Sequence, residues 1–315
     1  MLSRYKRQTN RFRLHVLGSF CDMKTITQIG RDHHVSSGIV SRIMEQMRYP
    51  KPAFLPRTIA IDEFRGNVGE KFQCLLVDPQ HHTVLDVLPT RNSEDLHAYF
   101  NQYPMKMRKK VRYIIMDLSS QFYSVMRSCF PKAKIIADKF HVVRLITWAL
   151  DKVRKKVQKN FAKNRRISFK RSKALLLKHS AELTEEEMDR VAIMLSVSDE
   201  LRLAYRLKEL FNDVMASKTR RHFKARYMWF KHEAEEYEIE EVMKHIATFD
   251  KWIKEIERSC VIGVTNGFIE GYNNRTKVLK RISYGFRNFN RFRNRLLCIA
   301  NNTEIQKRRR HKLTS

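Results

Sequence analysis

The chain has 315 residues, of which 43% are hydrophobic, so it can bury a substantial core and is not a disordered polycation. Lysine and arginine number 63 against 33 aspartate and glutamate, and this formal charge of +30 indicates a polyanionic partner, for which nucleic acid fits best because dispersed cations neutralise phosphates. A membrane partner is disfavoured because no run reaches the roughly 18 to 20 apolar residues that span a bilayer, and the N-terminus lacks an apolar signal core, so a cytoplasmic location is expected.

The first predicted elements are two short helices in residues 25–47. Apolar residues recur there at helical spacing around a polar break at Ser36 and Ser37. Either serine can cap the second helix, whose polar face would then be offered to a major groove. The candidate groove residues are Ser37, Ser41 and Arg42. Residues 1–57 hold 11 Lys/Arg and 3 Asp/Glu, which favours a helix-turn-helix DNA-binding region over the alternative, a plain helical hairpin; we assign it to residues 1–50.

A linker over residues 51–57 follows, because three prolines near it interrupt helix and favour extended chain. Short runs rich in β-branched and apolar residues then predict three antiparallel strands, at 58–64, 71–78 and 83–90. Next come a helix, a strand, a helix and a strand, at 93–103, 111–117, 119–130 and 134–138. This order is that of an α/β, RNase H-like fold with a mixed five-stranded sheet, whose first part spans 58–138.

The strand pattern disappears over residues 139–258, where we expect a large all-helical insertion. Its first part is strongly cationic, with 12 Lys/Arg and no acid between Lys152 and Lys178. A solvated helix face or a disordered loop is the alternative, but a DNA track is favoured. The candidate residues are Lys152, Lys155, Lys156, Arg165 and Arg166.

The chain returns to the core over residues 259–302. A turn leads into one helix up to Lys280, and a second helical pattern runs from Arg281 to Asn301. Its aromatic positions are expected in the core and its arginines outside, with Arg287 and Arg291 as candidates for DNA contact. Residues 303–315 form a basic tail that is expected to bind phosphate as a mobile arm.

Two aspartates stand where this sheet would bring them together. Asp62 lies within an otherwise apolar strand, where an unpaired carboxylate is costly to desolvate. Asp117 ends an apolar run at the C-terminal end of a central strand, where open α/β sheets place their sites. Because the first and fourth strands are adjacent in this order, the two carboxylates repel one another unless they share divalent metal. Hard oxygen ligands favour Mg²⁺ or Mn²⁺.

A third carboxylate is expected from the helix that returns to the sheet after the insertion, and Glu270 is the candidate. It would lie on the sheet-facing side, with asparagines one turn away at positions 266, 273 and 274. Two metal ions about 3.5 to 4 Å apart would then activate water or a DNA 3′-hydroxyl and stabilise the leaving oxygen of a displacement at phosphorus. For each acid taken alone, a salt bridge to the abundant lysines and arginines is the alternative.

Three blocks carry a family resemblance: AIDEF (60–64), MDLSSQFYSVMRSCFPKAKIIADKFHVVRL (116–145) and TNGFIEGYNNRTKVLKRISYGFRNFNRFRNRLL (265–297). In this order they resemble the ISL-three family of bacterial insertion-sequence transposases, and the resemblance covers most of residues 55–300. It implies a DDE transposase in which Asp62, Asp117 and Glu270 are the first, second and third catalytic, metal-binding acids. It also implies that the helical insertion precedes the Glu-bearing helix.

Asp138 and His141, in ADKFHV, match a DxxH signature that is similar to one found just after the last strand in several DDE transposase superfamilies. Asp138 is the alternative second acid. Asp117 is preferred because the sheet order puts its strand beside that of Asp62. Asp138 and His141 are therefore secondary candidates that brace the site or contact DNA, and a purely structural histidine is the alternative.

The sequence departs from that family in one respect. Members typically carry a cysteine-rich, zinc-binding segment ahead of the helix-turn-helix, whereas the five cysteines here are scattered without a CxxC pair. A truncated or naturally short form is expected, which bears on the recognition of transposon ends and leaves the catalytic acids unaffected.

These observations predict an enzyme that binds double-stranded DNA, namely the terminal inverted repeats of its own element and the target. It would hydrolyse and transfer strands with two Mg²⁺ or Mn²⁺ ions. A homodimer or larger assembly on DNA is expected because two ends must be brought together, and the location would be the bacterial cytoplasm in association with the nucleoid. Two alternatives remain, a transposase-derived DNA-binding protein that no longer cuts and an RNase H-like nuclease or resolvase.

Overall fold

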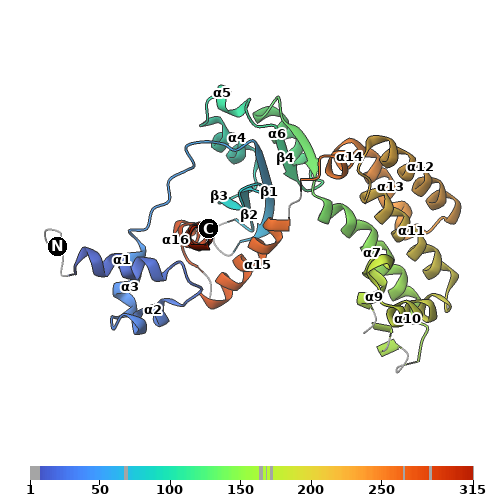
Figure 1. Cartoon of the computed structure of the whole chain (residues 1–315), viewed down its shortest axis with the longest axis horizontal. Helices are drawn as coiled ribbons and strands as arrows, with labels where there is room; N and C mark the ends of the chain where they lie inside the picture. Colours follow the sequence, from blue (N-terminus) through green and yellow to red (C-terminus); the bar gives the residue numbers. More distant parts are fainter. Residues whose placement is uncertain are drawn as a thin grey trace. The chain divides into compact units, whose positions relative to one another are not determined.

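The computed structural model of the chain describes residues 8–66, 70–162, 166–167, 169–170, 173–264, 267–283 and 286–314, with side chains up to residue 301. The chain divides into two compact units. Figure 1 labels the helices and strands of both and colours them by their place in the sequence. The first comprises Met1–Ile135 and Asn266–Ser315, and the second comprises Ile136–Thr265. Within the described residues, no helix is both long enough and apolar enough to cross a bilayer.

Three helices open the first unit: α1 (Asn10–Ser19), α2 (Ile26–Asp32) and α3 (Ser37–Met44). Of the two serines in the polar break, Ser36 is the one that caps α3, because its side chain accepts from the Ile39 amide. The sequence analysis did not predict α1. These helices share one apolar core with Cys298 from the far end of the chain, so they are not packed independently of the rest of the unit.

The turn between α2 and α3 depends on the absence of a side chain at Gly30. A Cβ there would lie 2.7 Å from the Val35 carbonyl oxygen, and the Val35 amide in turn donates to the Gly30 carbonyl oxygen at 2.9 Å. Because the neighbour is backbone in a hydrogen-bonded turn, it cannot rotate away. We expect Gly30→Ala to destabilise the folded chain by about 1–3 kcal/mol, as overpacking does.

Urea unfolding of the two glycine variants measures this effect. Gly38→Ala is the matched control, since a Cβ at Gly38 meets only the Ser36 hydroxyl at 3.8 Å and α3 has helical backbone there. Alanine should therefore stabilise at Gly38 by about 0.5–1 kcal/mol. Equal effects at the two positions would contradict the proposed tight turn.

Five strands form one sheet in the order β3-β2-β1-β4-β5. They are β1 (Thr58–Arg65), β2 (Phe72–Asp78), β3 (Thr83–Leu88), β4 (Tyr113–Met116) and β5 (Lys134–Ala137). β2 is antiparallel to both β1 and β3, whereas β4 is parallel to β1. The mixed five-stranded sheet, with helices inserted after its last strand, confirms the predicted RNase H-like α/β class.

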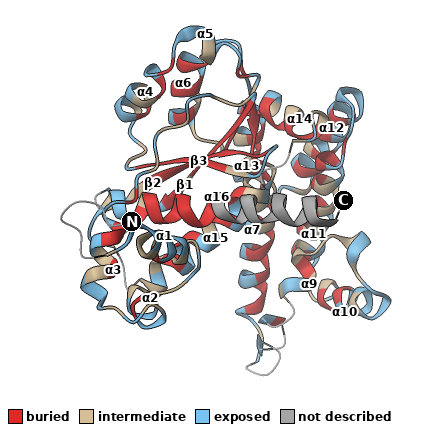
Figure 2. Ribbon diagram, turned by 60° about the vertical axis from the view of Figure 1, so that its left-hand side comes forward, coloured by how far each residue is buried: buried red, intermediate tan, exposed pale blue. Residues whose placement is uncertain are grey.

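Between the strands lie α4 (Ser93–Asn101), α5 (Met105–Arg108) and α6 (Ser120–Cys129), of which α4 packs against α6. After the second unit the chain forms α15 (Gly267–Ile282) and α16 (Phe289–Thr314). α15 packs on β1, and α16 packs on β3. The strands and the first part of α16 are coloured as buried in Figure 2. The region expected as a basic tail, 303–315, is helical backbone to Thr314 as part of α16.

Two arginines of α16 correct the expectation that its arginines lie outside. Arg293 donates to Asp86 on β3 at 2.6 Å and to the Tyr49 carbonyl oxygen at 2.8 Å, and Asp86 is only 2% exposed. Arg295 is 3% exposed and donates to carbonyl oxygens of the α1–α2 connection. Arg295 is buried and Arg293 is half-buried because α16 packs on β3 and shares a core with the N-terminal helices, a constraint that no local pattern carries.

After the last two residues of β5, the regular structure of the second unit is helical in its described residues. Its α-helices are α7 (Lys139–Gln158), α9 (Lys173–Leu177), α10 (Glu185–Leu195), α11 (Asp199–Met215), α12 (Arg220–Tyr237), α13 (Glu240–Lys251) and α14 (Ile253–Val261), and a short 3-10 turn, η1 (Ser180–Glu182), joins α9 to α10. α11 packs against α7 and α12.

A buried ion cluster on α7 is centred on Asp151, which is 5% exposed. Arg154 donates to Oδ1 of Asp151 through Nε at 2.9 Å and through Nη2 at 2.7 Å, and Lys155 and Lys173 each lie 3.0 Å from Oδ2. Burial by itself would raise the pKa of Asp151, but the hydrogen bonds from the three cations outweigh it and lower that pKa to about 2.

Candidate active site

Asp62 is one of the buried acids of the first unit. It lies in β1 and is 7% exposed, and its Oδ1 accepts from the Glu63 amide at 2.8 Å. Its Oδ2 accepts from the side-chain amide of Asn273 on α15 at 2.6 Å. These neutral donors do not offset the charge of the carboxylate, so a nearby cation would lower its desolvation cost.

Asp117 follows β4 directly. The parallel register of β1 and β4 pairs Thr58 with Tyr113 and Ala60 with Ile115. Two residues further along this register, Asp62 and Asp117 correspond to one another, so their side chains leave the same face of the sheet on strands about 4.8 Å apart. The predicted adjacency of the first and fourth strands is confirmed by the observed strand order.

The electrostatic surroundings of Cys74 agree with this placement. Cys74 lies on β2 opposite Glu63, and its thiol is buried. Burial raises the pKa of Cys74, and the negative charges of Glu63, Asp62 and Asp117 raise it further. The central part of the sheet therefore carries a concentrated negative field, which favours a cationic ligand.

One cation already lies on this part of the sheet. Arg91 is 2.5 Å from the carboxylate of Glu63, and its guanidinium lies 4.6 Å from the centre of the Phe72 ring. The hydrogen bond to Glu63 raises the pKa of Arg91, and the charge of Asp117 adds to that shift. Arg91 is thus committed to Glu63, whereas the carboxylate of Asp62 accepts from the Glu63 amide and from the side chain of Asn273.

Asn273 fixes how α15 lies over β1. Further along the helix Lys280 donates to the Arg65 carbonyl oxygen, so α15 follows the strand from Asp62 to its end. The Oδ1 atom of Asn273 is buried and has no hydrogen-bond partner within the described residues. An amide oxygen without a donor, beside a buried carboxylate, is a suitable ligand for a hard cation.

Glu270 lies in the first turn of α15 and is exposed. At about 100° per residue, it is roughly 60° around the helix from Asn273. Tyr272, which donates to the Ala300 carbonyl oxygen of α16, lies on the other side of Asn273. Because α16 packs on β3, which lies on the other side of β1 from β4, helix geometry directs the flank that carries Glu270 toward β4.

The three predicted acids do not form a closed cluster. Among the described residues, no group of three or more His, Cys, Asp or Glu side chains lies close enough together to hold a metal ion. The structure thus brings Asp62 and Asp117 to neighbouring strands and Glu270 to the helix above them. Asn273 was noted in the sequence only as a neighbour of Glu270, because its bond to Asp62 spans 211 residues of chain.

Asp138 and His141 form a local pair at the start of α7. Asp138 caps the helix, with its Oδ1 accepting from the Phe140 amide at 3.0 Å, and its Oδ2 lies 3.0 Å from Nδ1 of His141. Asp138 is 6% exposed. The DxxH spacing is explained at least in part by helix capping, since it places the histidine one turn into the helix that the aspartate caps.

The candidates for DNA contact in the first unit, which lie on α3 and at or just before the start of α16, differ in how far they are exposed. Ser37 and Arg42 are exposed on α3, whereas Ser41 is half-buried and lines a cavity beside α16. Arg287 lines the same cavity and is exposed, and Arg291 forms an ion pair with Glu45.

Lysines of the basic run in the second unit form ion pairs with acids that the sequence did not indicate. Three of the candidate lysines are paired with acids: Lys152 with Glu241 at 3.3 Å, Lys155 with Asp151 at 3.0 Å and Lys156 with Glu200 at 2.8 Å. Arg166 is exposed, and Arg165 lies outside the described residues. The acids that pair with Lys152 and Lys156 come from distant parts of the sequence, which is why the run appeared unpaired.

Known proteins give an independent view of the chain. A family model described as a transposase, of the DDE ISL3 type, matches residues 59–296. The transposase for insertion sequence element IS1001 of Bordetella parapertussis is 25% identical over 296 residues, which are 91% of this chain and 72% of that protein. The transposase for insertion sequence element IS1557 of Mycobacterium tuberculosis is 24% identical over 254 residues, which are 73% of this chain and 57% of that protein.

The family match begins on β1 and ends within α16, so it includes all three predicted acids and the helical second unit. The chain therefore belongs to the ISL3 (ISL-three) family of DDE transposases.

Proposed function

We propose that this chain cleaves and transfers DNA strands at the ends of an insertion sequence, and that Asp62, Asp117 and Glu270 hold the divalent metal ions this requires. The observation that supports the proposal is the parallel register of β1 and β4, which pairs Ala60 with Ile115 and, continued by two residues, would match Asp62 on β1 with Asp117 just after β4. Membership of the family supports the reaction class, and the relatives are named as transposases of insertion sequence elements.

The residues present fit a hard divalent cation. Asp62 is a buried carboxylate, and the unpartnered Oδ1 of Asn273 lies on the residue that donates to it. Carboxylate and amide oxygens are the ligands that Mg²⁺ and Mn²⁺ prefer. Asp62 and Asp117 would hold an ion between them, and Glu270 would complete the set from the β4-facing flank of α15.

Bound divalent ions would lower the pKa of an attacking water or 3′-hydroxyl and neutralise charge on the phosphodiester. The protein's own contribution is to keep the acids in register. β1 and β4 fix the spacing of Asp62 and Asp117, and the hydrogen bond from Asn273 holds one Asp62 oxygen toward α15. Asp138 is engaged in capping α7 and in its bond to His141, which supports Asp117 as the second acid.

The substrate would be duplex DNA carrying the terminal inverted repeats, bound through α3 and basic surfaces, and then target DNA. The charge of +30 supports a ligand with many phosphates. A dimer or larger assembly would bring two ends together.

Cleavage of a duplex that carries the element's end sequence tests the proposal. We expect nicking at the end when Mg²⁺ or Mn²⁺ is present and none in excess chelator, with DNA binding retained in both conditions. An unrelated duplex of equal length is the control. Binding without metal-dependent nicking would favour a transposase-derived protein that no longer cuts, for which the open arrangement of the acids is the relevant observation. Equal nicking of both duplexes would favour a nuclease or resolvase.

A further inference from the structure

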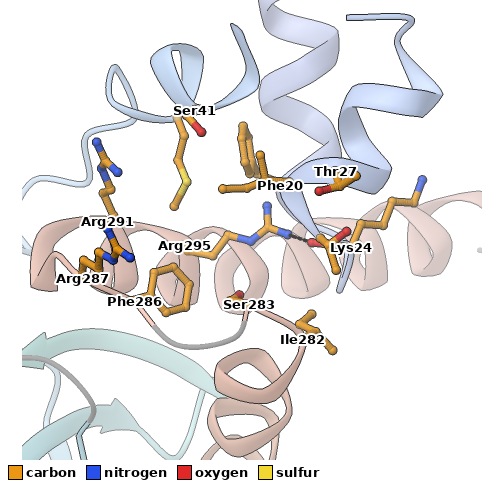
Figure 3. A pocket seen from close by; sticks show the side chains of 13 residues that line it. Phe20, Lys24, Thr27, Ser41, Ile282, Ser283, Phe286, Arg287, Arg291 and Arg295 are labelled. Carbon is orange, nitrogen blue, oxygen red and sulfur yellow. Dashed lines mark hydrogen bonds between the residues drawn. The ribbon is translucent and has the colours of Figure 1, made fainter. Parts of the chain in front are cut away.

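A cavity of about 920 Å³ lies in the first unit between the N-terminal helices and the α15–α16 region, and Figure 3 shows it from close by. Its lining includes four cationic side chains from both parts of the chain: Lys24, Arg287, Arg291 and Arg295. None of the described residues that line it is Asp or Glu. Lys24 pairs with Asp32 at 2.9 Å and Arg291 pairs with Glu45, so Arg287 and the buried Arg295 are the cations of this lining that would attract an anion most strongly.

Arg295 is the buried centre of this lining. It is 3% exposed, and its guanidinium lies 4.7 Å from the centre of the Phe20 ring. Nη2 donates to the carbonyl oxygens of Asp22 and Lys24, both at 2.8 Å, whereas Nη1 is buried and has no hydrogen-bond partner within the described residues. Burial lowers the pKa of Arg295 to about 10, so it remains charged at neutral pH. Its observed hydrogen bonds go to neutral carbonyl oxygens and one of its donors is unused within the described residues, so an anion bound beside it would be stabilised.

The remaining lining matches a phosphate rather than a carboxylate-rich protein surface. Arg287 is exposed, and Ser41 and Ser283 add hydroxyl donors. Figure 3 shows Arg287, Arg291 and Arg295 along the same side of the cavity. Arg287, Arg291 and Arg295 are spaced four residues apart. Each guanidinium can donate two parallel N–H bonds, a geometry that suits phosphate oxygens.

We propose that this cavity, called here the arginine cavity, binds the sugar–phosphate backbone of one DNA strand and so holds DNA against the N-terminal helices. The proposal rests on the proposed function for the presence of DNA, but not on the catalytic acids. The volume exceeds what a free phosphate fills, and Ser41 links the cavity to α3, whose Ser37 and Arg42 are exposed. A strand whose phosphates enter the cavity would therefore continue along the helix predicted to read the major groove.

Arg287→Ala is the main test because Arg287 is exposed, so its loss leaves the core intact. Binding to an end-sequence duplex is measured in chelator, where no cutting occurs, at several salt concentrations. We expect about tenfold weaker binding and a salt slope reduced by about 1, as for one lost phosphate contact. Arg190→Ala is the matched control, since Arg190 is an exposed arginine of the second unit that is not among the residues lining the cavity and pairs with Glu186 at 2.6 Å.

Ethylation interference identifies the phosphate itself. Wild-type protein should bind poorly when particular backbone phosphates are ethylated, and Arg287→Ala should lose its sensitivity at one or two of them while keeping the others. Inorganic phosphate at millimolar concentration is the second arm. If the cavity is a free-anion site, inorganic phosphate will stabilise the protein against heat and Arg287→Ala will keep the full interference pattern, which overturns the proposal.

Glu45→Gln should change DNA affinity in the opposite direction from Arg287→Ala. Glu45 forms the ion pair with Arg291, so it competes with phosphate for that guanidinium. Its neutralisation should tighten DNA binding severalfold and steepen the salt slope. Unchanged affinity and slope in both Glu45→Gln and Arg287→Ala would mean that DNA does not enter the arginine cavity, whether or not the protein cuts DNA.

Discussion

Asp62→Asn is expected to reduce metal-dependent strand cleavage by about a thousandfold or more, because the metal ions contribute several kcal/mol of transition-state stabilisation that depends on this carboxylate. DNA binding in chelator should be unchanged. The substitution is nearly isosteric and removes a buried charge, so the fold should be retained. Rates of end cleavage under single-turnover conditions measure the effect.

A second readout separates loss of metal from loss of chemistry. A bound ion stabilises the folded state, so Mn²⁺ should raise the melting temperature of the wild-type protein and have little effect on Asp62→Asn. Glu270→Gln should also abolish cleavage, but it should leave part of the thermal response because Asp62 and Asp117, which would hold an ion between them, both remain.

Asp78→Asn is the matched control for Asp62. Asp78 is a buried carboxylate at the end of β2, and it accepts from the amides of Gln80 and His81. It shares the sheet but lies outside the candidate site, so cleavage should persist. Full activity in Asp62→Asn would remove the basis of the proposed metal centre.

Asp151→Asn is expected to destabilise the second unit by about 3–5 kcal/mol, since it leaves the buried Arg154 without its carboxylate. Urea unfolding, followed by hydrogen exchange of α7 amides, measures the loss. Asp199→Asn is the control, because Asp199 forms an exposed ion pair with Arg202 and should cost about 1 kcal/mol or less.

The same cluster predicts a pH dependence with a definite sign. The pKa of Asp151 is about 2 in the folded chain and 3.8 ordinarily, so its ionised form favours folding. This contribution, up to about 2 kcal/mol, is present above pH 4 and is lost as the pH falls from 4 toward 2. The stability difference between wild type and Asp151→Asn should therefore shrink over that interval. A constant difference would show that Asp151 does not titrate with the fold.

Much of the sheet could be predicted because its strands are short apolar runs bounded by turn residues. The strands β1, β2 and β5 begin and end within one residue of the predicted bounds, although β3 is two residues shorter and β4 three residues shorter than predicted. The helix α1 was missed because its polar positions, among them Arg11, Arg13 and His15, blur the helical pattern. Periodicity reports on local structure only where one face is consistently apolar.

The contacts that form the candidate site and the arginine cavity could not be predicted from local sequence patterns. Asn273 meets Asp62, and Arg295 meets Asp22, through contacts that join opposite ends of the chain. Nothing in the spacing of α16 indicates that its arginines face carbonyl groups rather than solvent. The adjacency of β1, which carries Asp62, and β4, which Asp117 follows, was by contrast predictable from the order of the elements.

α16 carries a consequence for where the enzyme cuts. It packs on β3, and its Cys298 belongs to the same core as the three N-terminal helices, while Asn294 donates to the Met47 carbonyl oxygen at 2.8 Å. The helix that would read bases and the sheet that carries the acids are thus parts of one body. The number of base pairs between the recognised sequence and the cleaved bond would then be set by the folded unit, and not by a flexible linker between a DNA-binding domain and a catalytic domain.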